Sequence, residues 1–268
     1  MTSPPARFLS RGVGQLVAEL ELRQPTLVTL AELAALAVDA GVKTPPKVLA
    51  ARLRAAGWLL QTAQRGVYEF APGAHAGPYG HGDPFIDLRA ARIAEGVPGV
   101  VALQSALWLH GMADRTPNRH EVAIPVGARA PEAIRRGMRV VRFDHHLIPA
   151  DIEELAVHRP ATILTHLATK PGDVRGWGAF GEALPELAEN SSFEELEGEL
   201  AQRPGTVRPR LAYLLSGVTP GVADRLQPGR PPNVTWFGTE RVSRRFDGRF
   251  NVADSTLPFD PRTVTGAA

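Results

Sequence analysis

The chain has 268 residues, of which 44% are hydrophobic, and a net charge of +2. This is enough material for a small domain and a larger one, each with a buried core. It contains no cysteine, which excludes a disulfide scaffold and a thiolate zinc site. No stretch approaches the roughly 18 apolar residues of a membrane span, and residues 1–12 lack the apolar core of a signal peptide. We therefore expect a soluble, cytoplasmic protein that does not associate with a membrane.

Residues 12–71 carry the pattern of a small helical domain that ends in a hairpin. Thr29 and Glu32 have the spacing of a capping box, in which each side chain satisfies a free backbone amide of the first turn. Thr44 is expected to cap a third helix with Pro45 at its first position, where the missing amide hydrogen costs nothing. The expected elements are helices over 12–23, 30–41 and 45–57 and strands over 58–60 and 67–70. This order is typical of a winged helix-turn-helix.

The third helix and the hairpin are strongly basic. Between Asp39 and Glu69 the chain has five basic residues and no acidic one, which is rare on a surface that has no binding role. We therefore expect this surface to bind DNA. The alternative is an ordinary solvated face or a protein contact, because helix surfaces are commonly charged. The five residues are Lys43, Lys47, Arg52, Arg54 and Arg65.

Helical geometry selects the side chains that would face DNA. At about 100° per residue, the third helix buries Leu49, Leu53 and Ala56 and turns Arg52 towards a flank. The small Ala50, beside Ala51, would let the backbone approach a groove closely. The predicted DNA-contacting residues are Lys43, Thr44, Lys47, Ala51 and Arg54, with Gln64 and Arg65 at the tip of the hairpin.

A boundary is expected at residues 73–84, because the sequence there is rich in glycine and proline and lacks apolar periodicity. The predicted DNA-binding domain is therefore 1–72. His75, His81 and Asp83 could suggest a metal site within this linker. We favour a plain loop, because the rigid ligand spacing of a metal site is missing.

The second region, 85–268, predicts a larger mixed α/β domain, which makes the chain α+β. Ser191 and Glu194 have capping-box spacing at the start of an acidic helix. Asp247 and Gly248 indicate a tight hairpin turn, because both tolerate a positive φ. Helices are also expected over 86–95, 105–109, 151–155, 160–169, 207–216 and 220–226, and strands over 120–125, 138–143 and 233–238.

Two segments of this region are unusually charged. Seven glutamates and no basic residue lie between Glu182 and Glu199, which we interpret as the acidic helix 182–199. Residues 241–249 form a basic hairpin. Either segment fits a protein or RNA partner, and either fits a solvated surface.

Patterns for catalysis are weak. Ser105, His110 and Asp114 are the residue types of a hydrolase triad, but neighbouring positions on one helix and its exit do not converge on one substrate. His145 and His146 face opposite ways in an extended strand, so they do not form a metal site together, and one of them fits a buried position. We expect no catalytic residue, no metal and no cofactor, and we predict that the protein is not an enzyme.

Two stretches resemble the AbiEi family of type IV antitoxins, namely QRGVYEFAPGAHAG at residues 64–77 and LQSALWLHGMADRTPNRHEVAIP at 103–125. The most characteristic parts are RGVY in the first, and SAL followed by HG in the second. The resemblance implies a repressor that binds double-stranded DNA at the operator of its own operon. It also implies a C-terminal antitoxin domain that counteracts a nucleotidyltransferase-like toxin, for which a stable complex is not required.

An enzyme that acts on nucleic acid, with a winged helix as its targeting domain, is the alternative interpretation, because a dispersed active site leaves no motif. A solitary transcriptional regulator is another. A neighbouring gene for a nucleotidyltransferase-like protein would favour the antitoxin over both.

Overall fold

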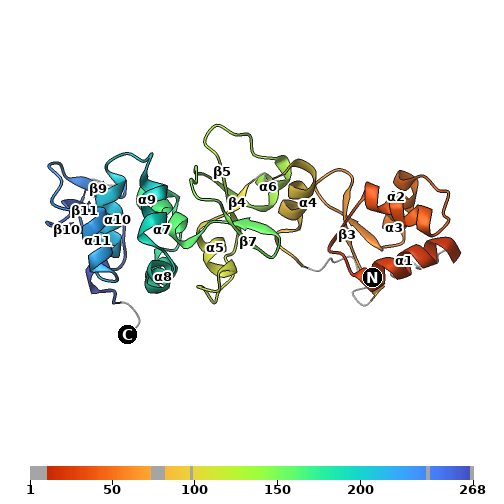
Figure 1. The fold of residues 1–268 in the computed structure, drawn as a ribbon, viewed down its shortest axis with the longest axis horizontal. Helices are drawn as coiled ribbons and strands as arrows, with labels where there is room; N and C mark the ends of the chain where they lie inside the picture. The colour runs from red at the N-terminus through yellow and green to blue at the C-terminus, as the bar shows by residue number, and fades with distance from the viewer. Residues whose placement is uncertain (1–10, 74–81, 97–98, 240–241, 266–268) are drawn as a thin grey trace. The chain divides into compact units, whose positions relative to one another are not determined.

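The computed structural model describes the chain in four stretches (Figure 1), which are residues 11–73, 82–96, 99–239 and 242–265. The fold is α+β, as predicted, with three separate sheets of three, three and five strands among the described residues. None of the helices in these stretches has the length and apolar character that a bilayer crossing requires.

The N-terminal elements follow the order expected of a winged helix-turn-helix. Their bounds are α1 (Arg11–Arg23), β1 (Leu27–Thr29), α2 (Leu30–Asp39), α3 (Pro46–Ala55), β2 (Leu59–Gln61) and β3 (Val67–Phe70). The apolar faces of the three helices close one core with Trp58 and Phe70 of the hairpin. The capping box of α2 is confirmed, because the Glu32 amide donates to Thr29 Oγ1 at 3.1 Å and the Thr29 amide donates to Glu32 Oε2 at 2.7 Å.

The start of α3 corrects the prediction that Thr44 caps it. The helix begins at Pro46, with Pro45 as the residue before it and no side-chain cap. Pro45 has a φ of −55° and a ψ of 140°. The ring of Pro46 explains this, because a proline disfavours helical ψ in the residue that precedes it. Pro45 therefore cannot be the first helical residue, and Thr44 lies one position too early to cap the helix.

The hairpin of β2 and β3, residues 59–70, is named the wing. A short strand that the sequence did not indicate completes its sheet. β1 pairs antiparallel with β3, which also pairs with β2, so the strand order is β1-β3-β2. The helix α4 (Ile86–Glu95) packs on this sheet, where Ala90 joins Leu27 and Val67 in a small buried cluster.

The chain divides into two compact units. The first comprises residues 1–98 and 131–136, and the second comprises residues 99–130 and 137–268. The first unit therefore includes α4 and most of α6 (Glu132–Gly137). This division falls later in the chain than the linker at 73–84 that the composition indicates.

The second unit opens on a mixed sheet with the order β6-β5-β4-β8-β7. A helix expected over 151–155 is wrong, because two strands run through this segment. Glu153 and Glu154 have φ values of 50° and 63°, which is the two-residue geometry of a type I′ hairpin turn. Glutamate is not a usual residue for that turn. The strands are β4 (Val100–Val101), β5 (Glu121–Ile124), β6 (Arg139–Arg142), β7 (Ala150–Ile152) and β8 (Leu155–Val157).

The helices of the second unit surround α7 (Pro160–Thr169), in which every residue from 161 to 168 is buried. The acidic segment 182–199 is not one helix, because α8 ends at Glu189 and α9 begins at Phe193. The cap of α9 is Ser192 with Glu195. Ser191 instead donates to the Leu187 carbonyl at 2.7 Å and closes the end of α8. The remaining helices are α5 (Leu103–Leu109), α8 (Trp177–Glu189), α9 (Phe193–Leu200), α10 (Val207–Leu215) and α11 (Pro220–Leu226).

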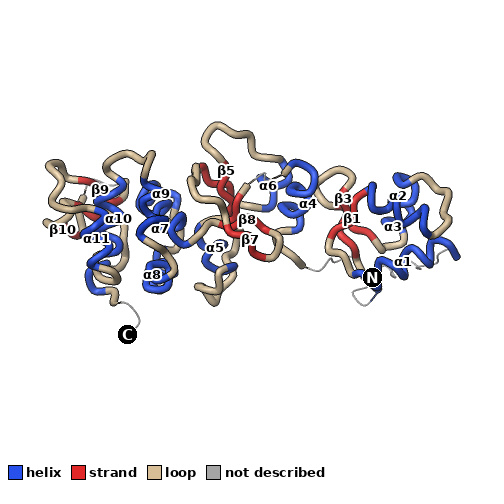
Figure 2. Tube along the Cα trace, in the orientation of Figure 1, coloured by secondary structure: helices blue, strands red, loops and turns tan. Residues whose placement is uncertain are grey.

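The third sheet has the order β10-β11-β9. Figure 2 shows β9 and β10 of this sheet near α10 and α11. Its strands are β9 (Thr235–Phe237), β10 (Arg245–Asp247) and β11 (Val252–Asp254). β10 and β11 form the predicted hairpin, but the tight turn at Asp247 and Gly248 is wrong. Four residues connect the strands, and the positive φ of 52° belongs to Asn251. Asp247 caps this longer loop, since its carboxylate accepts from the Phe250 amide at 2.8 Å.

Candidate nucleic-acid interface and C-terminal hollow

The outer face of α3 carries the side chains predicted to contact DNA. Lys47, Ala51 and Arg54 are exposed, whereas Leu49 and Leu53 are buried in the core. Lys47, Ala51 and Arg54 are spaced four and three residues apart, so they form one row along the helix. The expectation that Ala50 also reaches the surface is wrong, because this residue is fully buried. Close approach of the α3 backbone to a ligand would therefore depend on Ala51 and Ala55.

The positive charges of this unit are not neutralised by neighbouring acids. No ion pair forms at Lys47, Arg52, Arg54 or Arg65 within the stretches that the structure describes, and all four are exposed. Lys43 is exposed and unpaired in the same way, in the turn between α2 and α3, and Thr44 beside it is half-buried. A phosphate would meet these charges without first breaking an ion pair.

A shallow hollow separates one edge of α3 from the wing. Ala51, Arg54 and Ala55 of the helix line one side, and residues 59–61 of β2 line the other. Arg52 lies about 140° around the helix from Lys47, on the edge away from this row. The two arginines of α3 therefore differ in position although both are exposed. Only Arg54 shares a concave surface with the wing.

Two side chains that the sequence did not single out hold the tip of the wing. Thr62 is buried, donates to the Val67 carbonyl at 2.7 Å and accepts from the Gln64 amide at 3.2 Å. Asp87, from the first turn of α4, accepts from the Ala63 amide at 2.8 Å. These bonds leave Gln64 half-buried and Arg65 exposed at the tip. No local pattern connects Asp87 with Ala63, which are 24 residues apart.

The acidic residue of the suspected metal site has a structural role. Asp83 accepts from the Phe85 amide at 2.8 Å and forms an ion pair with Arg89 at 2.7 Å, so it anchors the start of α4. His75 and His81 lie outside the described residues. Within the described residues, no group of three or more histidines, aspartates or glutamates has the geometry of a metal site.

In the second unit, the residues of the suspected triad do not converge. Ser105 is fully buried, accepts from the Glu121 amide at 2.8 Å and lies 3.3 Å from His120 Nδ1. His110 Nε2 instead bonds the carbonyl of His158 at 2.8 Å. Asp114 is exposed in the following loop. A buried hydroxyl that already accepts a backbone hydrogen bond cannot reach a substrate, so Ser105 joins α5 to β5.

A cluster of histidines includes one residue of α7, and two of its members, His158 and His166, are buried. His158 stands with its ring 5.6 Å from His145 and 6.0 Å from His166, and Phe143 stacks on His166 at 4.0 Å. Neither ring nitrogen of His158 has a hydrogen-bond partner within the described stretches. Burial lowers the pKa of His158 well below its usual value, and nearby His166 lowers it further. Burial also lowers the pKa of His166, although Asp173 at 3.4 Å opposes this shift. We therefore expect both rings to be neutral near pH 7.

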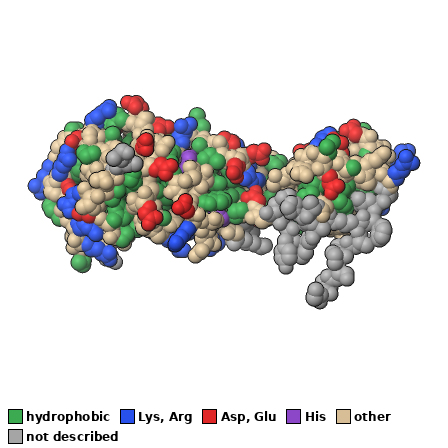
Figure 3. All heavy atoms as spheres, turned by 90° about the horizontal axis from the view of Figure 1, so that it is seen from below, with side chains coloured by type: hydrophobic (Ala, Val, Ile, Leu, Met, Phe, Trp, Pro, Cys, Tyr) green, Lys and Arg blue, Asp and Glu red, His purple; other side chains and the backbone are tan. Residues whose placement is uncertain are grey.

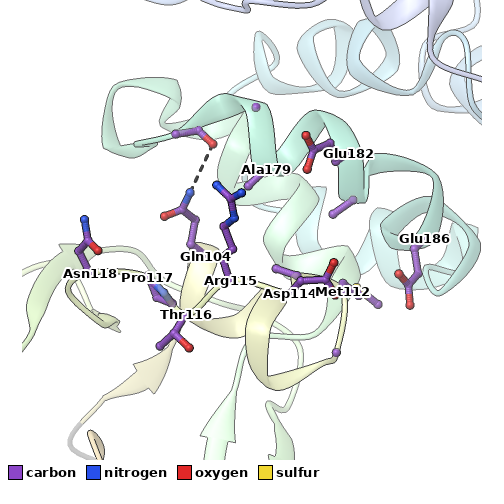
Figure 4. A pocket seen from close by; sticks show the side chains of 15 residues that line it. Gln104, Met112, Asp114, Arg115, Thr116, Pro117, Asn118, Ala179, Glu182 and Glu186 are labelled. Carbon is purple, nitrogen blue, oxygen red and sulfur yellow. Dashed lines mark hydrogen bonds between the residues drawn. The ribbon is translucent and has the colours of Figure 1, made fainter.

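The second unit has a polar hollow of about 890 Å³ between the loop after α5 and one side of α8. Figure 4 shows Arg115 reaching from the loop towards α8, which contributes Glu182 and Glu186. Gln104 closes one end with a 3.3 Å hydrogen bond to the Gly176 carbonyl. The described lining contains no histidine, serine, tyrosine or lysine, and its polar groups include the carboxylates of Asp114, Glu182 and Glu186 and the guanidinium of Arg115. Its charges suit a polar partner better than an apolar small molecule.

Comparison with known proteins assigns the middle of the chain to a family. Residues 99–217 match the family model of the AbiEi antitoxin C-terminal domain. This segment is an AbiEi antitoxin domain. The resemblance found in the sequence at residues 103–125 is thereby confirmed. No curated protein matches the chain.

The fold as a whole is shared with a solved structure. The crystal structure of the RV2827C protein from Mycobacterium tuberculosis superposes with a TM-score of 0.78 at 24% sequence identity, over 95% of each chain. At this identity the likeness concerns the fold, and it includes the N-terminal unit as well as the antitoxin domain.

The AbiEi antitoxin domain contains the five-stranded sheet, the polar hollow and the histidine cluster. It ends just after α10. The helix α11 and the three strands β9, β10 and β11 follow it in the chain, beyond the matched residues.

Proposed function

We propose that this protein is the DNA-binding repressor and antitoxin of a type IV toxin-antitoxin system. The N-terminal unit binds double-stranded DNA at the operator of its own operon, and the AbiEi antitoxin domain counteracts a nucleotidyltransferase-like toxin. It acts in the cytoplasm and without catalysis. The observation that carries the proposal is an unpaired basic face on α3 and the wing in a chain that also holds an AbiEi antitoxin domain.

The dimensions of α3 support contact with a major groove. A helix with its side chains is about 10–12 Å across, and the major groove of B-DNA is about 12 Å wide. Lys47 and Arg54 are seven residues apart, which separates them by about 10.5 Å along the axis and about 20° around it. They can therefore meet DNA from the same side of the helix, with Ala51 between them. The wing tip at Arg65 then contacts the backbone beside the groove.

The proposed neutralisation of the toxin does not require a stable complex. The antitoxin domain supplies a polar hollow lined by Arg115, Glu182 and Glu186, whose charges suit transient contact with a polar partner. Because the two proposed activities lie in separate compact units, they should be separable by substitution.

The test is to follow repression and toxin rescue in the same strains. A footprint on the DNA upstream of the gene identifies the operator. The toxin is then expressed with the full-length protein or with a Lys47→Ala/Arg54→Ala variant, both from a foreign promoter so that lost repression does not change the toxin dose. We expect the variant to lose the footprint and still to rescue growth. Rescue that disappears together with the footprint would show that neutralisation is only repression, and it would remove the separate role of the antitoxin domain.

A further inference from the structure

The C-terminal sheet has two different faces. Residues at alternate positions of β10 and β11 share a face, and Asp247, Val252 and Asp254 on the inner face are buried, as is Ala253 between the last two. On β9 the inward residues are Thr235 and Phe237. α10 packs against β9 and β11 and covers this side, and Figure 1 shows α10 beside the three strands. The remaining residue of each strand must point to the opposite side.

Those remaining residues form one row across the sheet. Phe246 of β10 pairs with Ala253 of β11, and Ala253 pairs with Trp236 of β9. Directly paired residues lie on the same face. The two rings are two strand spacings apart, about 9.6 Å, with the small Ala253 between them. Phe246 is 49% exposed, Trp236 is half-buried and Ala253 is buried, so Phe246 is the exposed ring of the outer face.

An exposed arginine precedes Phe246. Arg244 lies two residues before it, in the bend ahead of β10, and has no ion pair within the described residues. Figure 3 shows Lys and Arg side chains gathered at the end of the molecule that contains these strands. By contrast, Arg245 points inward and pairs with buried Asp254 at 3.0 Å.

We propose that the outer face of β9, β10 and β11, which we name the aromatic face, binds an unpaired nucleic-acid strand. Phe246 is its exposed ring, half-buried Trp236 and buried Ala253 lie in the same row, and exposed Arg244 precedes the strand. Bases stack on exposed aromatic rings whatever their sequence, and arginines hold the phosphates of the same strand. An acidic protein would also be attracted by the arginines but would not need the rings. The bases of a duplex are already stacked on one another and cannot use them.

The aromatic face is independent of the functions proposed above. It lies beyond residue 217, where the match to the AbiEi antitoxin domain ends, and it is far in the chain from the row on α3. Stacking and phosphate contacts do not distinguish ribose from deoxyribose, so RNA and DNA strands should both bind. The proposal thus gives the protein a second nucleic-acid site, with the opposite preference for strandedness.

The test uses the full chain with Lys47→Ala and Arg54→Ala, so that the charged row on α3 makes no contribution. Fluorescence anisotropy measures its Kd for labelled oligouridylate, oligothymidylate and a duplex, each about 12 nucleotides or base pairs long, within the ~4–16 nucleotides of known single-strand sites. We expect both single strands to bind more tightly than the duplex. Phe246→Ala should raise the Kd for the single strands about 5- to 150-fold, the equivalent of the about 1–3 kcal/mol of one stacked base.

Two further variants distinguish base stacking from nonspecific binding to an apolar side chain. Phe246→Leu keeps an apolar side chain but has no ring, so it should lose binding like the alanine. Phe246→Trp should retain it, and the added tryptophan fluorescence should be quenched by the strand. The matched control is Ile148→Ala, which removes an 83% exposed apolar side chain elsewhere in the second unit and should leave the Kd unchanged.

The contribution of charge is read from the salt dependence. Arg244→Ala should reduce the slope of log affinity against log salt by about 0.7, the value for one phosphate of a single strand. Arg129→Ala, at another exposed arginine that has no ion pair within the described part of the chain, should not change the slope. The proposal is overturned if the parent protein does not bind single strands, if the duplex binds equally well, or if Phe246→Leu binds like the parent.

Discussion

The most informative test of the N-terminal unit compares two arginines on the same helix. Arg54→Ala and Arg52→Ala remove the same side chain from exposed positions of α3, and neither arginine has an ion pair in the described structure. Arginine and alanine are both strong helix formers. Each variant should therefore unfold within about 0.5 kcal/mol of the parent, so that a difference in DNA binding reports position alone.

The magnitude follows from where the two side chains lie. Arg54 continues the row of Lys47 and Ala51 and borders the hollow next to β2. DNA that contacts both α3 and the wing would therefore lie against Arg54. If its guanidinium contacts a base, Arg54→Ala should weaken operator binding by about 1–3 kcal/mol, or about 5- to 150-fold in Kd. If it contacts only a phosphate, the loss should be smaller and the salt slope should fall by about 0.9. Arg52→Ala should have a much weaker effect.

The assay is anisotropy with a labelled operator duplex at several salt concentrations, after the footprint has defined the site. Thermal melts of both variants must match the parent for the comparison to count. Equal losses of operator affinity in Arg52→Ala and Arg54→Ala would refute the reasoning, because they would show that the face of α3 between these two arginines contacts the DNA. A larger loss at Arg52 would place the DNA on the side away from the wing.

Three further outcomes are expected. Arg65→Ala at the wing tip should reduce the affinity for operator and for random duplex by a similar factor in the same assay, because wing contacts to the backbone position the protein without reading bases. Glu199→Ala should lower the free energy of unfolding, measured in urea, by about 3–5 kcal/mol, because this fully buried carboxylate accepts hydrogen bonds from two amides, a hydroxyl and an arginine. The control is Glu194→Ala, at an exposed glutamate, which should change the free energy of unfolding much less. The pKa of His158 is lowered in the folded state, so on acidification the unfolded chain takes up a proton that the folded chain does not. The free energy of unfolding should therefore keep its full value above about pH 6.5 and fall as the pH drops below it. His158→Leu should flatten this loss in urea titrations between about pH 7.5 and 5, and an equal loss in both proteins would rule out this histidine as the cause.

The sequence by itself determined the features that depend on neighbouring residues. Helical periodicity located α1, α2 and α3, and the three-residue spacing of Thr29 and Glu32 located the start of α2. The row of Lys47, Ala51 and Arg54 follows from the same periodicity, because positions on one helix are related by a constant rotation. The short motifs in residues 103–125 also sufficed to indicate the AbiEi family.

Tertiary structure alone decided the features that join distant parts of the chain. Only the folded chain pairs β1 with β3, buries Ala50 beneath the surface of α3, and brings Asp87 to the wing tip. The aromatic face is of the same kind, since Phe246 and Trp236 become neighbours through β11 rather than through their own sequence. Strand pairing and burial depend on contacts between segments tens of residues apart, and local propensity carries no information about which segments will meet.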